Sequence, residues 1–197
     1  ASRQEIIRRY YKSMDAFVSG SGTENEVRKI ELLLQQAHAD LHDRKVVPAA
    51  LAKEESTGAP AAAMELPDGK IVCGKTSDLL GASAALLLNA LKELAGVDHE
   101  LHVISPDAIH PIQELKTKYL GSKNPRLHVD EILIALSMSA ATSDAARLAL
   151  EQIPNLRGCQ VHTSVMLSDV DVISFRKLGV ELTCEAKAEK KKKLQKN

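Results

Sequence analysis

The sequence predicts an α/β protein with three layers: a mixed, mostly parallel sheet that includes a β-hairpin, and a helical appendage at the N-terminal side. Apolar residues recur at helical spacing up to about residue 57, and short strand-like runs then alternate with helices. We expect a helical appendage over residues 1–58 and an α/β domain over residues 59–186. A basic, disordered tail is expected over residues 187–197, which include four consecutive lysines from Lys190.

The appendage is expected to contain three helices. Ser2 with Glu5, and Thr23 with Glu26, have the spacing of a capping box, in which a hydroxyl and a carboxylate satisfy free N–H groups at a helix start. Pro48 fits the first turn of the third helix, because its missing N–H has no helical partner there.

A β-hairpin is expected next, although the same stretch matches the phosphate-loop pattern G-x-x-x-x-G-K-[ST]. The matching residues are Gly69, Gly74, Lys75 and Thr76. A phosphate loop requires a strand that ends at the first glycine, whereas residues 67–69 have turn chemistry and residues 70–73 are strand-like. The sequence therefore predicts pairing of residues 61–66 with 70–73, and then a buried apolar helix over residues 77–95.

The rest of the domain is expected to alternate strands and helices. Strands are predicted over residues 101–104, 159–167 and, at an edge, 180–184, and the first two lead into helices capped by Ser105 and Ser168. Strand-helix-strand units of this kind imply parallel pairing with right-handed crossovers.

Three predicted strands end at a serine-rich helix start, and this repetition is the main indication of a site. Carboxyl ends of parallel strands meet at one edge of a sheet, where open α/β sheets hold ligands. Helix N–H groups and Lys75 would hold a phosphate or carboxylate there. Ordinary capping explains the same serines, and Asp78, Asp107 and Asp169 put negative charge at these positions. Both interpretations stay open.

The loop before residue 129 and one later histidine extend the candidate site. Arg126 and His128 lie in a polar loop that would bind an anion, and His162 would reach the same cleft as an acid or base. The candidate ligand-binding residues are Gly74, Lys75, Thr76, Ser77, Ser105, Arg126, His128 and His162. No metal site is predicted, since His99 and His102 would face opposite sides of a strand. Catalytic residues and cofactors are not assigned.

Composition disfavours several classes of protein. Lys and Arg together number 26, as do Asp and Glu, and aromatic residues make up 3%, so we expect no nucleic-acid partner. No apolar run is long enough to cross a membrane. Three widely spaced cysteines indicate reduced thiols and a cytoplasmic location. Because the chain opens at Ala1 without an initiator methionine, we expect a fragment of a longer protein.

Four runs, at residues 1–11, 74–83, 121–128 and 176–179, resemble the C-terminal part of a bacterial family catalogued as domain of unknown function 1846. The likeness spans most of residues 1–185. It implies that an N-terminal half is missing, in which such proteins carry a glycine-rich stretch similar to a nucleotide phosphate loop. No activity is established for the family, so no catalytic residue is carried over.

The expected function is binding of a phosphorylated or carboxylated small molecule, as part of a larger nucleotide-linked enzyme that includes the missing half. We also expect a homo-oligomer. The alternative function is that of a structural module without a catalytic site, which packs against another subunit through small-residue faces such as Ser137, Ser139 and Ala140.

Overall fold

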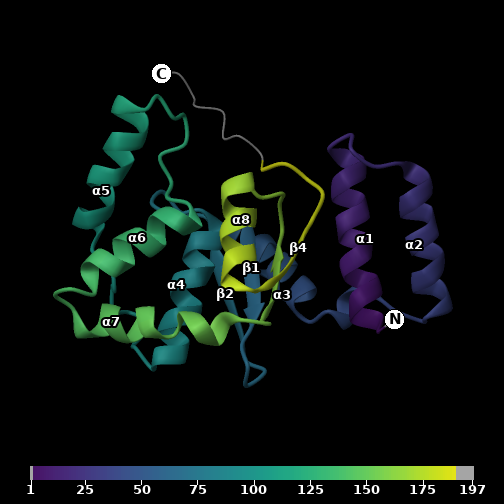
Figure 1. Cartoon of the computed structure of the whole chain (residues 1–197), viewed down its shortest axis with the longest axis horizontal. Helices are drawn as coiled ribbons and strands as arrows, with labels where there is room; N and C mark the ends of the chain where they lie inside the picture. Colours follow the sequence, from purple (N-terminus) through teal and green to yellow (C-terminus); the bar gives the residue numbers. More distant parts are fainter. Residues whose placement is uncertain (1, 190–197) are drawn as a thin grey trace.

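The computed structural model describes residues 2–189, in which a four-stranded sheet lies between helices (Figure 1). In Figure 1, α1 and α2 lie at one end of the molecule and α5, α6 and α7 at the other, with the sheet, α4 and α8 between them. The helices are α1 (Arg3–Val18), α2 (Glu24–Gln36), η1 (Leu41–Asp43), α3 (Val46–Thr57), α4 (Ala82–Ala95), α5 (Pro106–Glu114), η2 (Leu115–Tyr119), α6 (Val129–Ser139), α7 (Asp144–Glu151), η3 (Ile153–Leu156) and α8 (Asp169–Leu178).

The sheet is mixed, with strand order β2-β1-β3-β4. The strands are β1 (Ala61–Glu65), β2 (Ile71–Lys75), β3 (Gln160–Thr163) and β4 (Glu181–Cys184). The predicted hairpin of β1 and β2 is confirmed, and so is the edge position of β4.

The expectation of a mostly parallel sheet was wrong. β1 pairs antiparallel with both β2 and β3, and parallel pairing joins β3 to β4. Two physical causes produce this arrangement. The tight turn after Leu66 forces β1 and β2 to be antiparallel, and residues 101–104 form no strand, so the expected crossover unit at that point does not exist.

Both faces of the hairpin are buried, which explains its small and apolar residues. Ala62, Met64 and Val72 belong to the main core with α4, whereas Ala63 and the partly buried Cys73 pack with α3. Gly74 marks the closest approach, because a Cβ there would lie 2.2 Å from the backbone nitrogen of Leu86 in α4. Glycine is therefore required for α4 to pack on β2.

Most predicted helix starts are confirmed, since Ser2, Thr23, Ser105 and Ser168 each accept a backbone N–H in the first turn. The helix expected from residue 77 instead begins at Ala82. Ser77 caps a separate turn, in which its Oγ accepts the N–H groups of Leu79 and Leu80 at 3.3 and 3.1 Å.

Within residues 2–189, no helix combines the length and apolar character needed to span a membrane. The division at residue 58 stays a prediction. Most of the expected disordered tail, residues 190–197, lies outside the described residues, while Lys187 forms an ion pair with Glu54 at 2.7 Å.

Candidate functional site

Two of the three predicted junctions lie at the same edge of the sheet. β2 and β3 are both antiparallel to β1, which lies between them, so they run in the same direction. Ala61 is opposite Lys75 and Ala62 is opposite Thr163, which puts the carboxyl ends of β2 and β3 next to the start of β1. The chain continues from these ends to Ser77 and Ser168.

Ser105 is not brought to this edge. It caps α5 by accepting the Ala108 N–H at 3.3 Å, but no strand precedes it. Gln113 of the same helix donates to the carbonyl of Asp78 at 3.0 Å. Ser105 and Gln113 are eight positions apart, which corresponds to about 12 Å along a helix.

The starts of α4 and α6 are joined by backbone pairing. Leu127 donates its N–H to the carbonyl of Leu79 at 3.0 Å, and Gly81 donates to the carbonyl of Leu127 at 3.3 Å. Arg126 Nε donates to the carbonyl of Ser77 at 2.7 Å. The structure therefore brings together Ser77 and Arg126, two predicted residues that are far apart in the sequence.

His128 connects the start of α6 to that of α8. Its Nδ1 lies 3.2 Å from Asp171 Oδ2 and 3.4 Å from Ser168 Oγ, and Asp171 Oδ1 accepts the Val129 N–H at 2.8 Å. Three helices, α4, α6 and α8, consequently begin next to one another (Figure 1).

The pKa of His128 is raised above its ordinary value, chiefly by the hydrogen bond to Asp171, while burial and Lys116 oppose the rise. Lys116 is almost fully buried and fixes the loop, since its Nζ donates to the carbonyl of Arg126 at 2.5 Å and to Glu131 at 2.8 Å. The loop that carries Arg126 and His128 is therefore held in place by charged hydrogen bonds.

The start of α4 differs from the starts of α6 and α8. Its N-cap is Gly81, no side chain caps it, and its first turn contains no acidic residue, whereas α6 and α8 each have two. Among the described residues, the first-turn N–H groups of α4 at Ala82, Ser83 and Ala84 have no acceptor. Ser83 is 2% exposed and its Oγ is also without a partner there.

The other predicted residues of the junction have different environments. Lys75 is exposed at the end of β2. Thr76 is nearly buried, and its N–H donates to the carbonyl of Pro60 at 2.8 Å. Gly74 is explained by the packing of α4 on β2, which needs no ligand.

His162 lies in a separate buried cluster beneath α1. It pairs with Ala63, on the face of the sheet covered by α3, and its Nδ1 and Nε2 contact Thr183 Oγ1 at 2.8 Å and Glu185 Oε1 at 3.1 Å. The ring of Tyr11 in α1 packs on it, with centroids 4.8 Å apart. Burial lowers the pKa of His162. It therefore does not share a cleft with His128.

Sequence reasoning did not identify three polar residues that the structure singles out. Arg44 is fully buried in the His162 cluster and donates to Thr183 Oγ1 at 3.0 Å, and burial lowers its pKa to about 10. Asp171 stands three residues after the cap Ser168, and that spacing marks a first-turn acid. Ser83 is a polar residue among the alanines of the first turn of α4.

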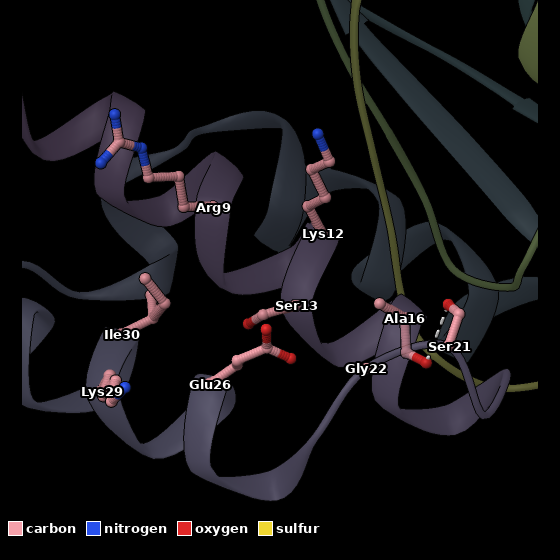
Figure 2. Close-up of a pocket in the computed structure, with 9 residues that line it drawn as sticks. All are labelled: Arg9, Lys12, Ser13, Ala16, Ser21, Gly22, Glu26, Lys29 and Ile30. Carbon is pink, nitrogen blue, oxygen red and sulfur yellow. Dashed lines mark hydrogen bonds between the residues drawn. The ribbon is translucent and has the colours of Figure 1, made fainter.

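Two hollows of the described surface lie away from the predicted residues. A groove of about 380 Å³ runs between α1 and α2, and Figure 2 shows the side chains that line it. They are Arg9, Lys12, Ser13, Ala16, Ser21, Gly22, Glu26, Lys29 and Ile30. A second hollow of about 360 Å³ lies beside the hairpin turn, at Pro67 and Arg157. Within the described part of the chain, no three His, Cys, Asp or Glu residues gather as metal ligands.

Comparison with known proteins identifies the family. Residues 42–194 match the family model described as "Domain of unknown function DUF1846, C-terminal". The chain belongs to this family. A "UPF0371 protein" of Corynebacterium glutamicum (strain R) is 53% identical over 191 residues, which cover 97% of this chain and 39% of the relative.

Two further relatives give the same result. The UPF0371 protein DIP2346 of Corynebacterium diphtheriae is 50% identical over 100% of this chain and 39% of its own length. The UPF0371 protein SpyM50764 of Streptococcus pyogenes is 50% identical over 93% of this chain and 37% of its own length. The chain thus spans about two fifths of the curated relatives it matches, and the predicted likeness to the family's C-terminal part is confirmed.

Proposed function

We propose that the chain binds a phosphorylated or carboxylated small molecule at the start of α4, as the C-terminal part of a larger, cytoplasmic, nucleotide-linked enzyme. One observation carries the proposal: α4 begins in a buried position with no cap, and Ser83 Oγ next to its free N–H groups is buried without a partner among the described residues. Unpaired buried donors are costly. An anion that accepts these hydrogen bonds would remove the cost and would lie at the positive end of the helix dipole.

The surrounding charges support an anion there. Arg126 is attached to the same turn through the Ser77 carbonyl, Lys75 lies two residues before Ser77, and His128 is adjacent through the pairing of residues 79–81 with 127. Two neighbouring carboxylates are engaged by other side chains, since Asp171 pairs with His128 and Glu131 with Lys116. Asp78 is exposed in the same turn, and Glu189 pairs with Arg126 at 3.1 Å, so a bound anion would compete with these two carboxylates for the positive charges. The relatives are more than twice as long as this chain, and we propose that the remainder of the binding site lies in a part of the protein outside this chain.

Ligand-dependent melting tests this proposal. The chain is heated with inorganic phosphate, sugar phosphates, nucleotides and dicarboxylates in turn. A ligand present at a hundred times its dissociation constant adds about 2.7 kcal/mol to the free energy of unfolding. That corresponds to roughly 5–11 °C for a chain of this size. Lys75→Ala is expected to weaken the shift, whereas Lys12→Ala, in the groove between α1 and α2, serves as the control and should leave it unchanged.

A second candidate function is assembly without a site of its own. Ile134 and Met138, four residues apart on one face of α6, are 58% and 71% exposed, and exposed apolar patches mark interfaces. The absence of a melting shift with every anion, together with a stable dimer in light scattering, would favour this candidate and reject anion binding.

A further inference from the structure

His128 and Asp171 form a histidine–carboxylate pair at the edge of the proposed anion site. Asp171 is 8% exposed, and its two oxygens have different partners: Oδ1 accepts the Val129 N–H at 2.8 Å, and Oδ2 lies 3.2 Å from His128 Nδ1. A carboxylate hydrogen-bonded to one ring nitrogen fixes the orientation of the imidazole and presents the other nitrogen for chemistry.

The other ring nitrogen, Nε2, is available. It has no hydrogen-bond partner among residues 2–189, and it is not among the buried unpartnered atoms, so it reaches solvent. The charged groups that face the ring are Asp171 from α8, Lys116 from η2 and Glu131 from α6. Of these, Lys116 and Glu131 pair with each other at 2.8 Å. Asp171 is therefore the charged group that chiefly controls the protonation of His128.

We propose that His128 is the proton-donating ligand contact of this site: its Nε2–H donates to an oxygen of the bound phosphoryl or carboxyl group, and Asp171 is its positioning residue. This inference rests on the proposed function. No bond of the ligand is made or broken in this step, and the proton stays on Nε2 within a charge-assisted hydrogen bond. Anion affinity is then coupled to protonation of His128, and by linkage a bound anion raises the pKa of His128.

Sulfate is the probe for this coupling, because it remains a dianion from pH 5 to 8 whereas phosphate titrates in that range. Calorimetry measures sulfate affinity at each pH, and NMR of the ring protons measures the pKa of His128 with and without sulfate. We expect affinity to fall about tenfold as pH rises through the pKa of His128, and this pKa to rise by about one unit in sulfate.

Asp171→Asn is the matched variant, since the amide keeps an oxygen that accepts the Val129 N–H but removes the charge beside His128. The pH at which sulfate affinity falls should move down with the lowered pKa of His128. A His128→Gln variant should bind sulfate with no dependence on pH. If Asp171 only caps α6, the Asn variant should show the same pH profile of sulfate affinity as the original chain. That result would overturn the positioning role of Asp171.

The outcomes separate this inference from the proposed function. Sulfate binding without any movement of the His128 pKa overturns the inference and leaves anion binding in place. Failure of sulfate and of inorganic phosphate to bind at any pH overturns both.

Discussion

Ser83 is the residue at which stability and ligand binding are expected to conflict. Its hydroxyl is buried with no partner among the described residues, and an unpaired buried hydroxyl lowers the stability of the ligand-free chain. Ser83→Ala should therefore raise the free energy of unfolding by about 1 kcal/mol, because it removes this penalty and adds a better helix former. The same change should weaken phosphate binding about tenfold.

Chemical denaturation and calorimetry on the same variant measure the two effects. Ser137→Ala is the control, because Ser137 is an exposed serine of α6 whose hydroxyl bonds to the carbonyl of Ile134. It should not change phosphate affinity. A clear loss of stability in Ser83→Ala would mean that its hydroxyl already has a partner, and would remove the main support for an anion at α4.

At the residue scale, the sequence predicted local chemistry well and long-range partners poorly. Ser2, Thr23 and Ser168 were identified as caps because a cap depends on residues two or three positions away. The pairing of His128 with Asp171 joins residues 43 positions apart, and no local pattern contains that information. Sequence reasoning for the same reason placed His162 in the cleft of His128, although it lies under α1.

At the element scale, the contact of α4 with β2 requires a residue without a side chain. A Cβ at Gly74 would approach Leu86 N to 2.2 Å. The other nearest atoms also belong to the backbone of α4, at Leu86 and Ala85, so no flexible side chain could move aside. Gly74→Ala should cost about 3 kcal/mol or more. Thermal unfolding should show a decrease of roughly 6–12 °C.

Gly81→Ala is the matched control for that measurement. Gly81 has φ −67°, which any residue adopts, and the nearest atom to an added Cβ is the Leu127 oxygen at 3.8 Å. Its effect should stay within about 1 kcal/mol. Equal melting temperatures for the two variants would contradict the close packing of α4 on β2.

The helices and the hairpin were accessible from the sequence, whereas the direction of strand pairing was not. Turn residues at 67–69 and the strand-like residues 70–73 specify the hairpin locally. The short run at residues 101–104 resembled a strand in composition, but no neighbouring strand is available to it. β1 pairs with β3 although almost a hundred residues separate them. The order of the strands therefore depends on long-range packing, which the spacing of apolar residues in the sequence does not reveal.

At the scale of the whole molecule, the chain corresponds to the C-terminal domain of longer relatives. Its relatives share about half of its residues over nearly its full length, yet it covers only about two fifths of theirs. The starts of α4, α6 and α8 are adjacent, and they line neither the groove between α1 and α2 nor the hollow beside the hairpin turn. Under the proposed function, this arrangement would be a half-site that a part of the protein outside this chain completes.

The most direct test of the account is to map phosphate binding on the amide spectrum of the chain. Backbone N–H signals are followed by NMR as inorganic phosphate is added at constant pH. The largest changes should fall at residues 77–84 and 126–129, with Ser83 among them. Changes concentrated at Arg9, Lys12 and Lys29 in the groove of Figure 2, or no saturable change at all, would contradict an anion site at the start of α4.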